Sequence, residues 1–237
     1  MSAAPRRALV TGGTRGIGEA TAIVLRDAGF DVVTTGTAKT GSGPAGCRYV
    51  GVDLAKPANA EAFAAEMAAE RFAVLVNNAG MNKVGPLEQY ALSDLENVLN
   101  VNLIAPYVLC RALVPGMRAA RYGRIVNITS IFGLVSKAGR SAYSASKFGL
   151  FGMTRALALE VAADNVLVNC VAPGFVDTDM TRRVLGDAGI AEMVRQVPMG
   201  RLATPEEIAR FIAFLCGEDN SFMTGQTVVL DGGFTCV

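Results

Sequence analysis

Short runs of apolar and β-branched residues alternate along the chain with longer segments in which apolar residues recur at helical spacing. Apolar strands that alternate with helices predict a parallel sheet covered on both faces, a doubly wound α/β fold of seven strands. The predicted strands are Ala8–Thr11, Asp31–Thr35, Arg48–Val52, Val74–Asn77, Arg124–Thr129, Leu167–Ala172 and Thr227–Leu230. The predicted helices are Ile17–Ala28, Ala58–Glu70, Ser93–Ala119, Ser141–Ala163 and Pro205–Cys216.

The connection between the second and third predicted strands differs from the others. Residues 36–46 contain four glycines and one proline, and such a segment does not hold a helix. A parallel crossover ordinarily contains one, so we predict a bare loop here. No linker, repeat or low-complexity segment interrupts the pattern, and residues 1–237 are expected to form a single domain.

Charge balance and hydropathy narrow the range of partners. The chain has 22 basic and 21 acidic residues, a net charge of +1, so neither nucleic acid nor a membrane surface is an expected partner. The longest charge-free apolar stretch, residues 97–110, is broken by Asn100, Asn102 and Pro106 and is too short to span a bilayer. The first residues lead into a strand and lack the apolar core of a signal peptide. We therefore expect a soluble, cytoplasmic protein.

Histidine is absent from the chain, which excludes a serine–histidine triad and histidine-based metal sites. The five cysteines lie far apart without a C-x-x-C pair, so we expect buried free thiols and no metal site. Any acid–base chemistry must then use tyrosine, lysine, aspartate, glutamate or cysteine.

A glycine-rich segment, residues 11–18, follows the first predicted strand and opens the first predicted helix. Gly12, Gly16 and Gly18 permit a tight turn and a close approach of the backbone to a pyrophosphate. The helix start then supplies free N–H groups and a positive partial charge. A glycine-rich turn alone is also common in plain loops, but its place between strand and helix favours a dinucleotide site.

Tyr143 and Lys147 fall near the start of a long predicted helix and project from one face, a turn apart. A lysine ammonium beside a phenol favours the phenolate and makes tyrosine usable as an acid or base near neutral pH. Such a pair is more often a plain surface pair. Ser130 lies at the end of a predicted strand, where parallel sheets place their ligands, although in isolation it is a turn serine.

Together, these features resemble the short-chain dehydrogenase/reductase family over essentially the whole chain. The family's motifs are matched in order at residues 11–18 (glycine motif), 77–80 (Asn-Asn-Ala-Gly), Asn102, Ser130, 143–147 (Tyr-x-x-x-Lys) and 173–174 (Pro-Gly). The resemblance implies a Rossmann fold and an NAD(P)-dependent oxidoreductase, which moves a hydride between a nicotinamide ring and a carbonyl or secondary alcohol.

The resemblance also implies roles for four catalytic residues. Tyr143 is expected to exchange a proton with the substrate oxygen, and Ser130 to hydrogen-bond the same oxygen. Lys147 is expected to hold the nicotinamide ribose and to lower the pKa of Tyr143. Asn102 is expected to bend its helix and to position a water that links Lys147 to solvent.

Further cofactor contacts follow from the same resemblance. Asp53 and Leu54 are expected at the adenine, Asn78 in the central cleft, and Val176 at the nicotinamide carboxamide. Asp53 could instead cap its strand, and Asn77 or Asn78 could only tie neighbouring strands together. The full set of expected cofactor contacts is Gly12, Thr14, Arg15, Gly16, Ile17, Gly18, Thr37, Asp53, Leu54, Asn78, Ala79, Gly80, Tyr143, Lys147, Pro173, Gly174, Val176 and Thr178.

NADPH is the expected cofactor, in preference to NADH. NAD-specific sites usually carry an acid at the end of the second strand, where it binds the ribose 2′-hydroxyl. Here that strand ends in Thr35-Gly36-Thr37, without a carboxylate. Arg15 can offer its planar donor fork to a 2′-phosphate, with Thr37 and Lys39 nearby. The alternative is a solvated Arg15 and a site that accepts either cofactor.

The substrate is less sharply indicated. Segments 123–128, 173–181 and 201–207 most resemble 3-oxoacyl-[acyl-carrier-protein] reductases, which implies a 3-oxoacyl thioester as substrate and acyl carrier protein as a partner. Sugar, polyol and small secondary-alcohol dehydrogenases of the family share much of the sequence of these segments. They form the alternative assignment of the substrate class. An arginine that carrier-protein reductases often place before the sixth strand is Asp164 here, whereas Arg121 matches their pattern.

Two other classes are less favoured. A catalytically silent family member would be expected to lack Ser130, Tyr143 or Lys147, and none is lost. Epimerases and dehydratases acting on nucleotide sugars tend to be longer, with a C-terminal substrate domain.

The last expectation concerns the oligomeric state. The helices predicted at 93–119 and 141–163 carry more apolar residues than one buried stripe requires, and residues 234–237 are also apolar. Family members commonly use these elements to build a dimer of dimers, so a homotetramer is expected.

Overall fold

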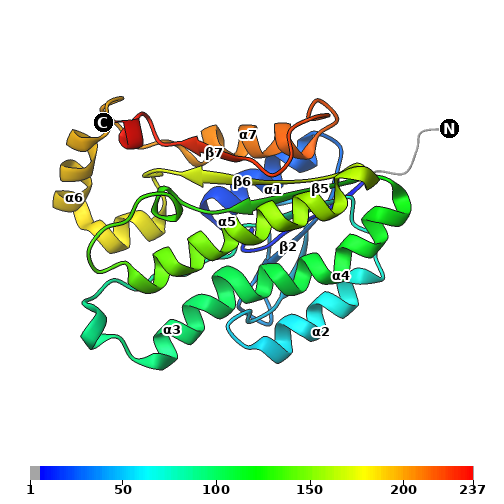
Figure 1. The fold of residues 1–237 in the computed structure, drawn as a ribbon, viewed down its shortest axis with the longest axis horizontal. Helices are drawn as coiled ribbons and strands as arrows, with labels where there is room; N and C mark the ends of the chain where they lie inside the picture. The colour runs from blue at the N-terminus through cyan, green and yellow to red at the C-terminus, as the bar shows by residue number, and fades with distance from the viewer. Residues whose placement is uncertain (1–5, 237) are drawn as a thin grey trace.

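The computed structural model describes residues 6–236, and its centre is one parallel sheet (Figure 1). The strand order is β3-β2-β1-β4-β5-β6-β7, and every neighbouring pair is parallel. The order reverses between β1 and β4, which opens a crevice at the carboxyl ends of these strands, where open α/β sheets bind their ligands. The strands are β1 (Arg7–Val10), β2 (Asp31–Gly36), β3 (Arg48–Gly51), β4 (Val74–Asn77), β5 (Gly123–Ile128), β6 (Val166–Pro173) and β7 (Thr227–Leu230).

Helices cover both faces of the sheet (Figure 1). On one face pack α1 (Gly16–Asp27) and α7 (Pro205–Cys216), and on the other α2 (Pro57–Ala68), α4 (Ala105–Ala120) and α5 (Ser141–Val161). Successive strand residues supply the two cores. In β1, Ala8 and Val10 belong to the α1/α7 core and Leu9 to the α2/α4/α5 core. The doubly wound sheet of seven strands is therefore confirmed.

One predicted helix is divided in two. Residues 93–119 were expected to be continuous, but the structure has α3 (Leu92–Leu99), a π-helical turn (Asn100–Ile104) and then α4. The long helix at 141 likewise ends at Val161, followed by a 3-10 turn, Ala162–Asp164. The loop after β2 carries no helix, as predicted: residues 37–47 lead directly into β3.

A further helix, α6 (Asp179–Gln196), was not predicted. Its first turn begins at Thr178, whose hydroxyl accepts a hydrogen bond from the Thr181 N–H at 3.2 Å. Gly186 interrupts it with φ +63°, and few of its residues are buried. A segment with no continuous apolar stripe gives little periodic signal. Short 3-10 turns lie at Leu87–Gln89, Ile131–Gly133 and Phe234–Cys236.

The helical stretch Leu92–Ala120 is the one part of residues 6–236 that is long and apolar enough to cross a membrane by length and composition. Half of its most apolar window is buried inside the protein. Its apolar residues pack against the sheet and against α2, as in the core helix of a folded domain. The hydropathy of this stretch is therefore accounted for by the fold.

Candidate active site

The glycine loop between β1 and α1 is packed against the end of β4. Gly12 and Gly16 adopt φ values of +65° and +57°, a region that favours glycine. A Cβ on Gly12 would lie 2.9 Å from the Ala79 Cα, and one on Gly18 only 2.2 Å from the Gly12 oxygen. Side chains at these positions would therefore push the loop away from the sheet edge.

The start of α1 is open at this loop. Arg15 is the N-cap residue, in extended conformation, and its side chain forms no capping hydrogen bond. Thr14 and Arg15 are exposed, while Ile17 is half-buried. The first-turn N–H groups thus lack a side-chain acceptor, and together with the helix dipole they suit a pyrophosphate. The residues present fit a dinucleotide at this loop.

Asn78 and Thr11 hold the glycine loop in shape. The Asn78 amide donates to the backbone oxygens of Thr11 and Gly12, at 2.9 and 3.0 Å. The Thr11 hydroxyl in turn accepts hydrogen bonds from the N–H groups of Asn78 and Ala79, both at 3.0 Å. Asn77 ties β4 to β5 through Asn127 at 2.8 Å. Both asparagines thus connect neighbouring strand ends, and the expected contact of Asn78 with a cofactor stays a prediction. Thr11 is a supporting residue that was not foreseen.

Asp53 follows β3 but faces its own turn. Its carboxylate accepts a hydrogen bond from the Ala55 N–H at 3.1 Å and lies 3.7 Å from the Lys56 ammonium. This is the strand-capping arrangement. Leu54 beside it is buried, and Thr37 on the neighbouring loop is exposed.

Ser130 and Tyr143 meet at the carboxyl end of β5. The Ser130 hydroxyl accepts a hydrogen bond from the Phe132 N–H at 3.2 Å and caps the turn that follows the strand. Burial raises the pKa of Tyr143, while hydrogen bonding with Ser130 and the charge of Arg140 act in the opposite direction. The Tyr143 phenol is therefore protonated at neutral pH and able to act as a proton donor.

Lys147 lies one helical turn after Tyr143 on α5 and is 4 % exposed. Its ammonium donates to the Ile128 oxygen at 2.8 Å and lies 5.6 Å from the centre of the Tyr143 ring. Burial lowers the pKa of Lys147 to about 8. Burial is the largest influence on the pKa of Tyr143, and the expected lowering of this pKa by Lys147 stays a prediction.

Asn102 sits in the π-helical turn and is fully buried. Its oxygen accepts from the Met81 N–H at 2.9 Å, and its amide donates to the Met81 oxygen and the Ser146 hydroxyl, both at 3.0 Å. A Cβ on Gly80 would lie 3.6 Å from the Asn102 oxygen and 3.8 Å from the Lys147 nitrogen. The helix irregularity expected at Asn102 is present, and it brings Asn102, Gly80 and Lys147 together.

The loop after β6 closes the crevice from the other side. Thr178 lies against the glycine loop, since a Cβ on Gly16 would be 3.2 Å from its methyl group. Val176 is buried and pairs with Ala203, and Gly174 packs against Asp231. The segment from Pro173 to Thr178 therefore lies across the crevice from the glycine loop, and its contact with a nicotinamide ring stays a prediction.

A pocket of about 110 Å³ opens beside Ser130 and Tyr143. It adds residues that sequence reasoning missed, above all Arg140 and the first turns of α6. A lone arginine three positions before Tyr143 carries no recognisable signal in a single sequence. The lining residues are Asn82, Ser130, Ile131, Phe132, Arg140, Tyr143, Gly174, Phe175, Met180, Thr181 and Leu185.

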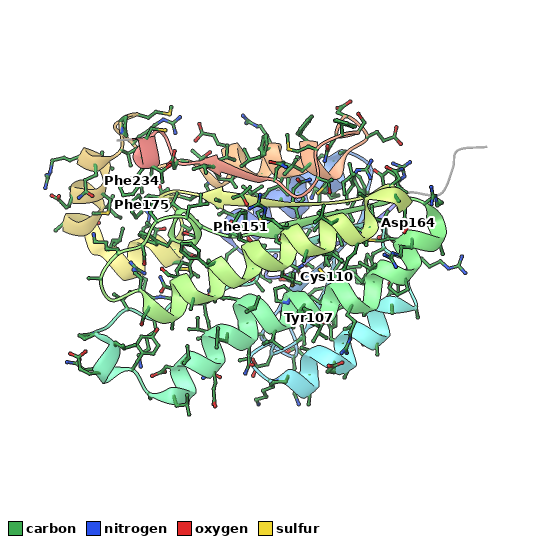
Figure 2. The ribbon with its side chains drawn as sticks, viewed as in Figure 1. Tyr107, Cys110, Phe151, Asp164, Phe175 and Phe234 are labelled. Carbon is green, nitrogen blue, oxygen red and sulfur yellow. The ribbon has the colours of Figure 1, made fainter. Side chains whose placement is uncertain are left out.

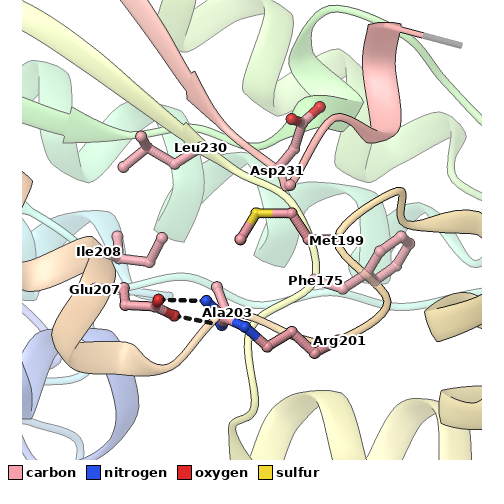
Figure 3. A pocket seen from close by; sticks show the side chains of 9 residues that line it. Phe175, Met199, Arg201, Ala203, Glu207, Ile208, Leu230 and Asp231 are labelled. Atoms are coloured by element: carbon pink, nitrogen blue, oxygen red, sulfur yellow. Dashed lines mark hydrogen bonds and ion pairs between the residues drawn. The ribbon is translucent and has the colours of Figure 1, made fainter.

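A second hollow, of about 180 Å³, lies between β7 and the start of α7 (Figure 3). Phe175 lines both hollows, and its ring packs edge-on against that of Phe132 at 6.3 Å between ring centres. It packs in the same way against Phe234 at 5.2 Å (Figure 2). The Arg201–Glu207 ion pair, at 2.7 Å, closes one wall of the second hollow. None of the four catalytic candidates lines it.

Comparison with known proteins agrees with this geometry. Residues 12–235 match a family model described as enoyl-(acyl carrier protein) reductase. The chain is 39 % identical to the 3-oxoacyl-[acyl-carrier-protein] reductase of Aquifex aeolicus, over 95 % of both chains. It is 37 % identical to that of Escherichia coli, over 97 % of both.

Solved structures resemble the chain over nearly its whole length. One, described as an NAD(P)-dependent gluconate 5-dehydrogenase from Beutenbergia cavernae with bound NADP, has a TM-score of 0.91 and 38 % identity, covering 100 % of this chain and 99 % of its own. A 3-oxoacyl (acyl-carrier-protein) reductase from Agrobacterium tumefaciens with NADP bound has a TM-score of 0.90 and 36 % identity, covering 96 % and 93 %. The chain belongs to the short-chain dehydrogenase/reductase family and is an NAD(P)-dependent oxidoreductase.

Proposed function

We propose that the protein is an NADPH-dependent reductase of 3-oxoacyl thioesters and that Tyr143 is its general acid. The observation that carries the proposal is the pocket in which Ser130 and Tyr143 meet, at the sheet edge that also holds the glycine loop. The 3-oxoacyl-[acyl-carrier-protein] reductases among its relatives support this substrate class.

The side chains divide the chemistry between them. NADPH, when bound, supplies a hydride to the carbonyl carbon. Ser130 donates a hydrogen bond to the carbonyl oxygen and orients it, and Tyr143 gives that oxygen its proton. Because burial keeps the phenol protonated at neutral pH, Tyr143 needs no prior activation in the reductive direction. Lys147 binds the nicotinamide ribose, and Asn102 orders the helix turn through which a water reaches Lys147.

Recognition of NADPH over NADH is assigned to Arg15. Its side chain is exposed at the start of α1 and forms no capping bond, so it is free to turn towards a 2′-phosphate. β2 ends at Gly36 and is followed by exposed Thr37, with no carboxylate to repel that phosphate. The relatives solved with NADP bound support this preference.

Acyl carrier protein is the proposed macromolecular partner, with Arg121 as a basic contact. The Arg121 side chain is 67 % exposed, but it forms an ion pair with Asp164 at 2.9 Å, and Arg118 binds the same carboxylate at 3.2 Å. Part of the basic charge is therefore already neutralised. A small 3-oxoacyl thioester is therefore proposed as a substrate alongside the carrier-protein thioester.

A second candidate function is oxidation or reduction of a small polar substrate, such as a sugar acid or polyol. Arg140 and Asn82 place polar groups in the pocket. An unbranched acyl chain has no polar group that could bind to them. The structural relative described as a gluconate 5-dehydrogenase supports this candidate.

We also propose a homotetramer in the cytoplasm. Large apolar side chains are exposed on the outer faces of α4 and α5, which lie side by side (Figure 2). They include Tyr107 on α4 and Phe148 and Leu159 on α5, with Leu159 85 % exposed. An exposed apolar surface of this kind favours association.

A cofactor-oxidation screen tests the proposed function. NADPH consumption is followed with acetoacetyl and longer 3-oxoacyl thioesters and with small diketones, and NADP⁺ reduction with polyols and sugar acids. The proposal predicts the highest kcat/KM for a 3-oxoacyl thioester. Faster turnover of polyols or sugar acids would favour the second candidate.

A further inference from the structure

The pocket beside Ser130 and Tyr143 contains a buried cation that has no part in the proposed proton and hydride transfer. Arg140 immediately precedes α5, three residues before Tyr143, and is 8 % exposed. Its guanidinium carbon lies 5.5 Å from the centre of the Phe132 ring. Among the described residues that line this pocket, Arg140 is the only one that carries a charge at neutral pH.

Arg140 has no anionic partner within residues 6–236. None of the neighbours that influence its pKa is a carboxylate: burial lowers the pKa of Arg140, and the groups that act in the opposite direction are the phenols of Tyr143 and Tyr90. No aspartate or glutamate lines the pocket. A guanidinium buried without a counter-charge is costly, and here it faces the space that the substrate enters.

A second polar group in the same pocket also lacks a partner. The side-chain oxygen of Asn82 is buried and forms no hydrogen bond with any described residue. An amide can accept from a hydroxyl or, after rotation, donate to an anionic oxygen. Arg140 and Asn82 thus leave unused hydrogen-bonding capacity next to the oxygen site formed by Ser130 and Tyr143.

We propose that Arg140 is a specificity-determining residue that binds a carboxylate of the substrate while Ser130 and Tyr143 bind its carbonyl oxygen. The planar guanidinium presents paired N–H groups that match the two oxygens of a carboxylate. The apolar side chains of Phe132 and Phe175 in the pocket wall strengthen this pairing by excluding water. The inference rests on the proposed function only for the position of the substrate carbonyl, whose oxygen is bound by Ser130 and Tyr143.

Two kinds of substrate would supply this carboxylate. A free 3-oxo acid carries it at the carbon that a thioester would otherwise occupy. A 3-oxo dicarboxylic acyl thioester carries it at the far end of the acyl chain. Both present the same chemistry to Arg140, and each is tested against a neutral analogue of matched length.

The experiment measures kcat/KM for two matched pairs with NADPH. One pair is acetoacetate and methyl acetoacetate, and the other is the 3-oxoadipyl and 3-oxohexanoyl thioesters of N-acetylcysteamine. In at least one pair the wild-type protein is expected to prefer the carboxylate by about ten- to a hundredfold, the range for a hydrogen bond to a charged group. In Arg140→Gln this ratio is expected to fall to near unity, and Arg140→Lys should retain part of it.

Lys137→Gln is the matched control, because it removes an exposed cation three residues before Arg140 that does not line the pocket. Its ratios should equal those of the wild type. Wild-type ratios near unity in both pairs would overturn the proposal, as would ratios that persist in Arg140→Gln.

A binding measurement separates this inference from the proposed function. The thermal midpoint of the NADPH-bound protein is measured with the same four compounds, whether or not they are reduced. The carboxylate member of a pair should raise the midpoint of the wild type and not that of Arg140→Gln. Without these ligands, Arg140→Gln should melt no lower than the wild type, because it removes an uncompensated buried charge. Lower melting with no loss of carboxylate selectivity would instead identify Arg140 as a structural residue.

Discussion

The Lys147 ammonium donates a hydrogen bond to the backbone oxygen of Ile128, 2.8 Å away at the end of β5. This bond fixes the lysine beneath the edge of the sheet on which Ser130 lies two residues later. The long side chain is thereby held within the crevice, close to Gly80 and Asn102. Because it is desolvated there, its pKa falls to about 8 from an ordinary value of 10.5.

The buried state of Lys147 predicts a pH-dependent stability. Lys147 has a lower pKa in the folded protein than in the unfolded chain, so the folded protein releases this proton at a lower pH. The buried charge therefore lowers the free energy of unfolding below pH 8, and this loss is recovered between about pH 8 and 10.5. Relative to Lys147→Met, the wild type should gain up to about 1.4 kcal/mol per pH unit across that window. Urea unfolding of both proteins at several pH values measures the difference. A difference that does not vary with pH would contradict the buried ammonium.

Cofactor preference is predicted to depend on Arg15. Removing the guanidinium in Arg15→Ala should raise KM for NADPH by about ten- to a hundredfold, the worth of one charge-assisted contact, and should leave NADH nearly untouched. Arg15→Lys keeps the charge but loses the planar pair of donors, so its KM for NADPH should lie between those of the wild type and Arg15→Ala. Equal weakening of both cofactors, or equal wild-type use of NADH, would refute the assignment.

Association through α4 and α5 is predicted to need Leu159. Leu159→Glu places a charge on the most exposed apolar position of α5 and should dissociate the homotetramer in light scattering. Leu87→Glu, a matched change in the 3-10 turn outside these helices, should not. An active monomer in dilute wild-type solution would exclude the tetramer as the functional form.

The buried thiols predict a loss of stability in alkali. Burial raises the pKa of Cys110 to about 12 and that of Cys170 to about 11, from an ordinary 9.0, and it also raises that of Cys216. Each thiol stays neutral in the fold but ionises in the unfolded chain, so its contribution to stability is complete below pH 9 and is lost as the pH rises through the folded pKa. In Cys110→Ser the alkaline slope of the unfolding free energy should be smaller by about 1.4 kcal/mol per pH unit. The exposed Cys236 supplies the control, Cys236→Ser, and identical slopes in all three proteins would contradict the account.

The strands could be predicted almost to the residue because each is a short run rich in apolar and β-branched residues. The five inner strands are mostly buried, whereas β3 and β7 at the two edges of the sheet are only partly buried or exposed. The same reasoning failed for α6, since its side chains are mostly half-buried or exposed and Gly186 breaks its period. The periodic pattern also predicted one continuous helix where the structure has α3 and α4. The π-helical turn between them depends on hydrogen bonds of Asn102 with Met81. A contact that is distant in sequence leaves no periodic signal.

The site was predictable where its residues form motifs of fixed spacing, as with Tyr143 and Lys147. Which way each side chain points was not predictable. The Asp53 carboxylate caps its own turn, and the Lys147 ammonium binds the backbone at the end of β5. Arg140 was missed because burial without a counter-charge is a property of the folded pocket, and a single sequence gives no sign of it.

The central claim is that Tyr143 donates the proton during reduction of a 3-oxoacyl group. The most direct test follows NADPH oxidation with the 3-oxohexanoyl thioester of N-acetylcysteamine, in the wild type and in Tyr143→Phe, which keeps the ring and removes the donor. We expect turnover by the wild type, a kcat at least about a hundredfold lower in the variant, and little change in the dissociation constant for NADPH. A wild type that oxidises no NADPH with this thioester, or a variant that retains over half of the wild-type turnover, would contradict the account.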